Sequence, residues 1–125
     1  MTQPQGAIPG VDAAEAADRL NRADAPKPLL VDVREIDEFR DVRVEGAALV
    51  PMSSFAERHT ELPKDRPLLV MCAGGTRSAA ATAFLLRGGW TDVVNVEGGI
   101  TAWQRQGLPV RRGDPEPGEG DLPAS

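Results

Sequence analysis

The sequence predicts an α/β fold, a parallel sheet of four to five strands with helices on both faces. Three short, mainly apolar runs at residues 29–33, 68–71 and 93–96 alternate with segments that have helical patterning. Because these runs lack the polar alternation of half-exposed strands, we expect both of their faces to be buried. Strands that alternate with helices in this way are typical of parallel sheets covered on both sides.

Capping and helix-breaking residues mark the elements in the first half of the chain. A very short strand is expected at 7–8. Asp12 is a suitable N-cap for a helix. This helix is expected to end at about Arg22, because a turn with two prolines follows. After the strand at 29–33, the pattern predicts a short helix at 35–40 and a weaker strand at 47–51.

The second half continues the alternation of helices and strands. Its expected elements are a helix from Ser53 or Ser54 to about Glu61, a strand at 68–71, a helix at 78–87, a strand at 93–96 and a helix at 100–106. The helix at 78–87 is apolar on nearly all sides, so we expect it to be packed deeply. Glycines directly after the last two helices provide their ends.

Composition limits the domain organisation and the class of protein. The chain has 125 residues, of which 41% are hydrophobic and 26% charged, values typical of one soluble globular domain. We expect a flexible leader at 1–6, a folded domain at 7–112, and a disordered acidic tail at 113–125, which is rich in proline and glycine.

Charge and the absence of targeting signals exclude several partners. A net charge of −5 argues against binding to nucleic acid or to a membrane surface. The first residues lack the basic start and apolar core of a signal peptide, and no apolar run is long enough to span a bilayer. A single cysteine cannot form an internal disulfide, so nothing indicates an oxidising compartment. The expected location is the cytoplasm.

The single cysteine, Cys72, lies where a strand is expected to end and a helix to begin. Gly74 and Gly75 allow the loop between them to curl, so that several backbone N–H groups can point at one anionic atom. These groups and the positive end of the helix dipole favour the thiolate, the nucleophilic form of cysteine. Arg77 adds a permanent positive charge at the rim. A lone cysteine is more often a small buried apolar residue, but its position in this loop favours a nucleophile.

Other chemistries lack the residues that they require. One histidine and one cysteine cannot provide a zinc site, and no nucleotide-phosphate loop of the common types is present. We therefore expect neither a metal nor a cofactor. His59 lies among charged residues and is expected at the surface, without a catalytic part.

Three motifs in order give the chain a family resemblance. They are Leu-Val-Asp-Val-Arg-Glu at 30–35, Cys-Ala-Gly-Gly-Thr-Arg-Ser at 72–78, and Val-Glu-Gly-Gly-Ile-Thr-Ala-Trp at 96–103. With Gly-Leu-Pro-Val at 107–110, they resemble a single-domain rhodanese, a sulfurtransferase, over about 7–111. The resemblance implies a rhodanese-like three-layer fold. It also implies transfer of a sulfane sulfur from thiosulfate, a persulfide or a polysulfide to cyanide or a thiol, including a protein thiol.

The resemblance assigns roles to the matching residues. Cys72 would accept the sulfur and become a persulfide. The terminal sulfur would be held by the N–H groups of Ala73, Gly74, Gly75, Thr76, Arg77 and Ser78. Arg77 would also help to bind the anionic donor. Asp32 and Arg34 would brace the loop from the neighbouring strand end, although a plain surface ion pair is an equal alternative. Trp103 is expected to be a packing residue.

Two further observations bear on substrate choice and on the alternatives. The family often has Gly-His-Ile-Pro-Gly-Ala before its second strand, but here Arg43 replaces the histidine and Glu45 the proline. The effect on substrate choice is therefore open. Four residues separate Cys72 from Arg77, whereas phosphatases and arsenate reductases that resemble this fold have one more. A phosphatase-like or arsenate-reductase-like enzyme is thus the weaker alternative, beside a non-catalytic binding or regulatory module.

Overall fold

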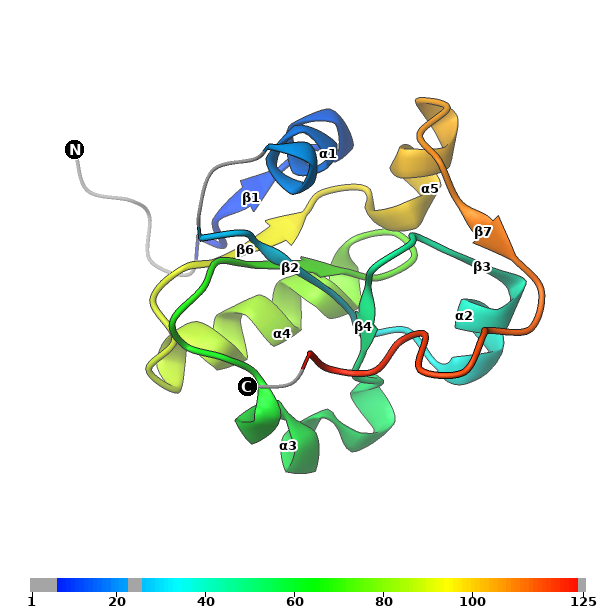
Figure 1. Cartoon of the computed structure of the whole chain (residues 1–125). Helices are drawn as coiled ribbons and strands as arrows, with labels where there is room; N and C mark the ends of the chain where they lie inside the picture. Colours follow the sequence, from blue (N-terminus) through cyan, green and yellow to red (C-terminus); the bar gives the residue numbers. More distant parts are fainter. Residues whose placement is uncertain (1–6, 23–25, 124–125) are drawn as a thin grey trace.

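The computed structural model describes residues 7–22 and 26–123, and it confirms the predicted α/β fold with a parallel sheet (Figure 1). Five parallel strands form the sheet in the order β1-β6-β5-β2-β4. They are β1 (Gly10–Val11), β2 (Leu29–Asp32), β4 (Ala48–Leu49), β5 (Leu68–Met71) and β6 (Val93–Val96). The central strand β5 is fully buried, as its continuous apolar sequence predicts.

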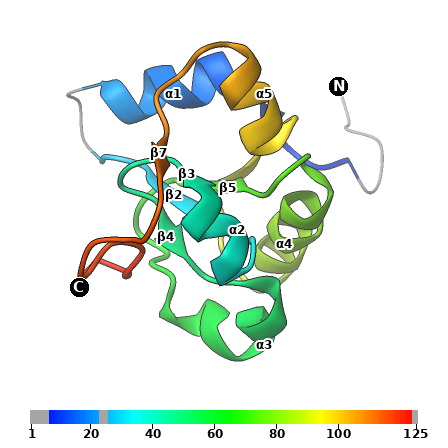
Figure 2. The same cartoon turned by 90° about the vertical axis from the view of Figure 1, so that its right-hand side faces the viewer.

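Helices cover both faces of this sheet and complete the three layers (Figures 1 and 2). One face carries α1 (Ala13–Asn21) and α5 (Gly99–Arg105), and the other carries α3 (Phe55–Arg58) and α4 (Thr76–Arg87). Alternate residues of β2 supply the two apolar cores, because Leu29 and Val31 belong to the α3/α4 side and Leu30 to the α1/α5 side.

Some element boundaries agree with those predicted from the sequence, and others differ. Asp12 caps α1, and its Oδ1 accepts a hydrogen bond from the Glu15 N–H at 2.8 Å. The short helix α2 (Ile36–Asp41) confirms the expectation at 35–40. The short N-terminal strand lies at Gly10–Val11 instead of 7–8. The helix expected up to Glu61 is divided into a 3-10 turn, α3 and a second 3-10 turn.

The C-terminal segment differs from the disordered tail that composition predicts. β7 (Arg111–Arg112) pairs antiparallel with β3 (Val42–Arg43), a small second sheet that the sequence analysis does not predict. Beyond it, the Gly120 carbonyl accepts a hydrogen bond from the Leu49 N–H at 2.7 Å. Leu122 packs against the core on the α3/α4 side. The chain is therefore placed against the domain as far as Leu122, beyond the boundary expected at 112.

A buried arginine explains why the C-terminal segment is held against the domain. Arg43, only 1% exposed, forms an ion pair with Glu119, with Nε 2.6 Å from Oε2. Its Nη1 also donates to the Gly113 carbonyl at 2.6 Å. A buried guanidinium needs such partners, because leaving it unpaired is costly. The tail supplies them, despite a composition that by itself favours disorder.

The expected leader at 1–6 lies outside the described residues. Within 7–22 and 26–123, no helix combines the length and apolar character needed to cross a membrane.

Candidate active site

Cys72 follows β5 directly, at the carboxyl end of the central strand, and α4 begins four residues later at Thr76. The turn between them depends on Gly75, whose φ is +105°. A Cβ at this position would also lie only 3.1 Å from the backbone nitrogen of Gly98. The tight turn directs the Gly75 N–H at the Cys72 Sγ, over 3.0 Å. The loop thus curls around the sulfur atom as predicted, but Gly75 alone of the two glycines has a positive φ.

The surroundings of Cys72 favour its ionised form. The residue is 1% exposed, and burial alone raises the pKa of its thiol. Hydrogen bonds from the Ser78 hydroxyl and from the N–H groups of Ser78, Gly75 and Gly74 outweigh this effect and lower the pKa below its usual value. These contacts therefore favour the thiolate, the form in which a cysteine acts as a nucleophile.

The third motif holds the cysteine loop from the other side. The carbonyl of Cys72 accepts a hydrogen bond from the Ile100 N–H at 2.9 Å, and that of Ala73 accepts one from Thr101 at 3.1 Å. A Cβ on Gly99 would collide with both carbonyl oxygens. The second glycine of this motif is therefore needed for the close approach of α5 to the loop.

Arg77 has a partner that the sequence analysis missed. Its two Nη atoms lie 2.8 and 2.9 Å from the carboxylate oxygens of Glu38, in α2. The hydrogen bond to Arg77 is the main cause that lowers the Glu38 pKa to about 2, and in turn Glu38 raises that of Arg77. The charge expected at the rim is thus partly neutralised. A carboxylate at N3 of a short helix gave no local sign of this pairing.

Asp32 and Arg34 form a buried ion pair, so the alternative of a plain surface pair is wrong. Their side chains are 1% and 3% exposed, and the shortest distance, Arg34 Nη2 to Asp32 Oδ2, is 2.8 Å. Arg34 also donates to the carbonyls of Val42, at 2.7 Å, and Glu38, at 3.2 Å. These contacts anchor α2 to the end of β2. The pair thereby supports the helix that carries the partner of Arg77.

The remaining predicted loop residues occupy different environments. Ala73 is half-buried, whereas Gly74 and Thr76 are exposed. Ser78 is fully buried, with its hydroxyl 3.3 Å from Cys72 Sγ and 2.6 Å from Oδ1 of Asn95 in β6. Asn95 was not predicted as part of the site. A single polar residue in an otherwise apolar buried strand is the signal that could have identified it.

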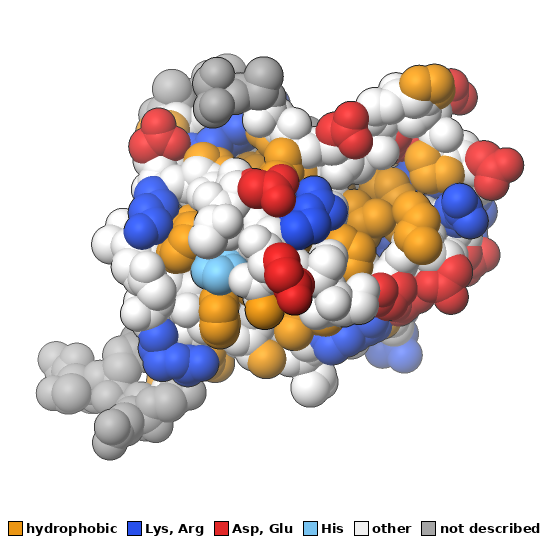
Figure 3. Space-filling model, turned by 90° about the horizontal axis from the view of Figure 1, so that it is seen from below, with side chains coloured by type: hydrophobic (Ala, Val, Ile, Leu, Met, Phe, Trp, Pro, Cys, Tyr) orange, Lys and Arg blue, Asp and Glu red, His pale blue; other side chains and the backbone are white. Residues whose placement is uncertain are grey.

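Three other residues lie in packing or support positions. Trp103 is buried, as predicted, and its Nε1 donates to the Pro109 carbonyl. His59 is half-buried on the face shown in Figure 3, where its ring lies 4.7 Å from that of Phe84 and 5.7 Å from that of Trp90. Arg43, in the place of the family histidine, is directed to the C-terminal segment by its bonds to Glu119.

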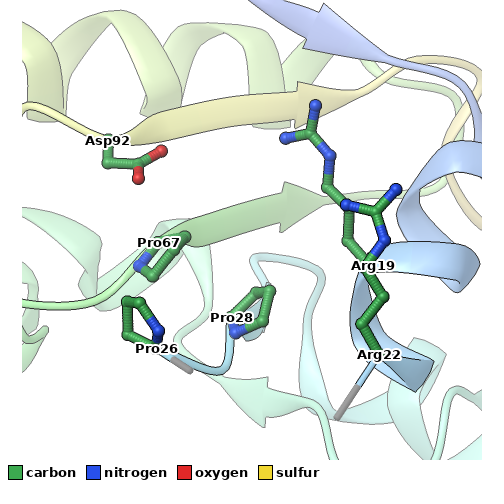
Figure 4. Close-up of a pocket in the computed structure, with 6 residues that line it drawn as sticks. All are labelled: Arg19, Arg22, Pro26, Pro28, Pro67 and Asp92. Atoms are coloured by element: carbon green, nitrogen blue, oxygen red, sulfur yellow. The ribbon is translucent and has the colours of Figure 1, made fainter. Parts of the chain in front are cut away.

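A hollow lies at the amino ends of the central strands, away from Cys72. Its lining includes Pro67 and Asp92, which directly precede β5 and β6 (Figure 4). Arg19 and Arg22 also line it, and they form ion pairs with Glu15 and Asp18 on α1. The chemistry of the cysteine loop therefore does not involve this hollow. Within the described ranges, no cluster of three or more His, Cys, Asp or Glu could hold a metal ion.

Comparisons with known proteins agree with this geometry. The sequence model of the rhodanese-like domain family matches residues 12–106. A protein named sulfurtransferase from Allochromatium vinosum is 39% identical over 100 residues, covering 80% of this chain and 92% of that protein. Thiosulfate sulfurtransferase GlpE from Actinobacillus succinogenes is 37% identical over 82 residues, covering 66% of this chain and 74% of that one.

Solved structures give the same result. The crystal structure of a rhodanese-related protein from Thermoplasma volcanium has a TM-score of 0.75 and 33% sequence identity. The similarity covers 83% of this chain and 98% of the other. Sequence and structure together show that the chain belongs to the rhodanese-like domain family.

Proposed function

We propose that the protein is a sulfurtransferase that carries a sulfane sulfur on Cys72, taking it from thiosulfate, a persulfide or a polysulfide. The observation that carries this proposal is the Gly75 N–H directed at Cys72 Sγ over 3.0 Å, in a loop that favours the thiolate. The similarity to proteins named sulfurtransferase, one of them a thiosulfate sulfurtransferase, supports the same reaction. The acceptor would be cyanide or a thiol, including a protein thiol.

The reaction would proceed in two balanced exchanges at sulfur. The Cys72 thiolate attacks the outer sulfur of the donor, the donor S–S bond breaks, and sulfite or a thiolate leaves with the bonding electrons. Preorganised N–H groups of the loop stabilise the negative terminal sulfur of the persulfide. The acceptor then attacks this sulfur and releases the Cys72 thiolate. Little proton transfer is needed once the thiolate exists, so no general acid or base is required.

The second half-reaction needs an external acceptor. The chain contains one cysteine, so no other thiol of the same chain can attack the persulfide. Because the persulfide on Cys72 divides the reaction into two half-reactions, we expect the donor product to leave before the acceptor reacts, which gives ping-pong kinetics.

Intact mass spectrometry tests the proposal directly. The protein is incubated with thiosulfate and, separately, with glutathione persulfide; the control is protein whose Cys72 was first alkylated. We expect a gain of one sulfur atom only in the unblocked protein, and its removal by cyanide. No gain with either donor would contradict the proposal and favour a binding module. Hydrolysis of an aryl phosphate by the unblocked protein would instead indicate phosphatase-like chemistry.

Replacing Glu38 with glutamine is expected to strengthen binding of a dianionic donor. The substitution removes the negative charge that partly neutralises Arg77, while keeping a hydrogen-bonding side chain of the same size. One charge at a partly exposed position is worth up to roughly 1 kcal/mol, so KM for thiosulfate should fall by about three- to fivefold.

Two further variants make this prediction specific. Arg77→Ala should raise KM for thiosulfate, because it removes the positive charge itself. Glu45→Gln is the matched control, since that glutamate is mostly exposed and pairs with Arg111 instead. An unchanged KM in both Glu38→Gln and Arg77→Ala would show that Arg77 does not bind the donor.

A further inference from the structure

The Ser78 hydroxyl faces two acceptors but has one proton to donate. Its Oγ lies 2.6 Å from Asn95 Oδ1 and 3.3 Å from Cys72 Sγ. A hydroxyl can fully satisfy only one of two such acceptors at a time. All three residues are buried, Ser78 completely and Cys72 and Asn95 to more than nine-tenths. The direction of one O–H bond therefore decides whether Cys72 receives this hydrogen bond.

The orientation of the Asn95 amide is set by its second partner. Its Nδ2 donates to the Gly75 carbonyl at 3.3 Å. If the amide were turned over, its oxygen would face that carbonyl, and two acceptors would oppose each other without a hydrogen between them. Hydrogen-bond partners of this kind determine which end of an amide is the oxygen. The carbonyl oxygen of Asn95 thus faces Ser78.

We propose that Asn95 is a positioning residue whose carbonyl oxygen competes with Cys72 Sγ for the Ser78 proton. While Cys72 is a thiol, the Ser78 hydroxyl donates its hydrogen bond to Asn95. A lone pair of the Ser78 oxygen then faces the S–H group of Cys72. When the thiol loses its proton to solvent, the Ser78 hydroxyl turns to the sulfur. The buried Asn95 oxygen then loses the hydrogen bond from Ser78, and leaving this acceptor unsatisfied costs free energy.

This competition suits a cysteine that must both take up and release sulfur. A lower thiol pKa makes a thiolate a better leaving group but a weaker nucleophile. Ser78 by itself would stabilise the thiolate, whereas Asn95 partly withdraws that stabilisation. Ser78 and Asn95 together therefore give the Cys72 thiolate an intermediate stability, suited both to attack on the donor and to departure from the persulfide. In this respect the inference rests on the proposed function.

Charged groups near Cys72 stay the same when Asn95 is altered. Arg77 on α4 interacts electrostatically with Cys72, and Glu38 on α2 and Asp32 on β2 interact with Arg77. The groups of β6 and α5 that contact the loop are uncharged, namely the Asn95 amide and N–H groups such as that of Ile100. A neutral substitution at Asn95 thus leaves the charges around Cys72 unchanged.

The ultraviolet absorbance of the thiolate provides the test. Because the chain has one cysteine and no tyrosine, a pH titration of this absorbance reports Cys72 alone. We compare the wild type with Asn95→Leu, Ser78→Ala and the double variant, without any sulfur donor. Leucine has the same branched arrangement of heavy atoms but forms no hydrogen bond. Asn95→Leu should increase the thiolate fraction about three- to tenfold at a pH below the pKa, since one hydrogen bond is gained.

The double variant separates this role from a purely structural one. In the Ser78→Ala background, the change at Asn95 should no longer increase the thiolate fraction, because there is no proton to redirect. If Asn95 acts only by holding the Gly75 carbonyl, its loss should decrease the thiolate fraction in both backgrounds. That decrease, or no change, would overturn the proposal. Asn95→Ala repeats the measurement if the leucine variant does not fold.

Thr82→Val is the matched control. The Thr82 hydroxyl is also buried on α4, and it donates to the Ser78 carbonyl at 2.8 Å. Its loss should reduce the free energy of unfolding but leave the titration of Cys72 unchanged. Since the absorbance is read without a donor, the test remains decisive even if no sulfur transfer is found, so the two proposals can fail independently.

Discussion

Replacing Cys72 with serine is expected to abolish sulfur transfer while leaving the fold intact. A serine hydroxyl is hardly ionised near neutral pH and cannot form the persulfide, so both half-reactions are lost. Removal of a covalent nucleophile reduces turnover by about a thousandfold or more. Formation of thiocyanate from thiosulfate and cyanide measures the loss.

The stability of this variant serves as the control. Serine is close to cysteine in size and can still accept the Gly75 N–H, so the free energy of unfolding should change by no more than about 2 kcal/mol. A folded Cys72→Ser protein that keeps turnover within about tenfold of the wild type would contradict covalent catalysis by Cys72.

Replacing Asp32 with asparagine is expected to cause the largest loss of stability. The change leaves the guanidinium of Arg34 in the protein interior without its counter-charge. Breaking one partner of a buried pair typically costs about 3–5 kcal/mol. Because domains of this size are stable by only about 5–15 kcal/mol, the variant should be close to unfolding. Urea denaturation followed by circular dichroism measures the difference.

Asp18→Asn provides a matched comparison on the surface. Asp18 pairs with Arg22 at 2.6 Å, but their side chains are 59% and 49% exposed. Exposed pairs contribute about 0–1 kcal/mol, so this change should scarcely alter the denaturation midpoint. Equal losses in the two variants would show that burial does not govern the contribution of the Asp32–Arg34 pair.

The fold could be predicted well because its signals are local. Continuous apolar runs identify β2, β5 and β6, and Asp12 marks the start of α1 through its own side chain. The cysteine loop was also predictable, since its two glycines indicate a tight turn before a helix. In these places the neighbours along the chain determine the structure.

The missed residues depend on contacts between distant segments. Glu38 reaches Arg77 across 39 positions of sequence, and Asn95 reaches Ser78 across 17. Glu38 accepts a hydrogen bond from the Glu35 N–H in a capping box at the start of α2, which is a local role and gives no sign of the distant contact with Arg77. Asp32 and Arg34 were identified, but their burial was not, because an ion pair has the same sequence at the surface and in the interior.

The ion pair between Arg43 and Glu119 has a consequence for how this molecule is divided. The match to the family model ends at residue 106, but the partner of a buried arginine lies beyond that point. A fragment cut at the family boundary would therefore expose a core cation and is a different folding unit from the whole chain. We expect the peptide bonds around Glu119 to be protected in limited proteolysis, although the composition of this segment alone predicts that they are cleaved readily. The segment that neutralises this buried charge thus lies outside the residues that the family model matches.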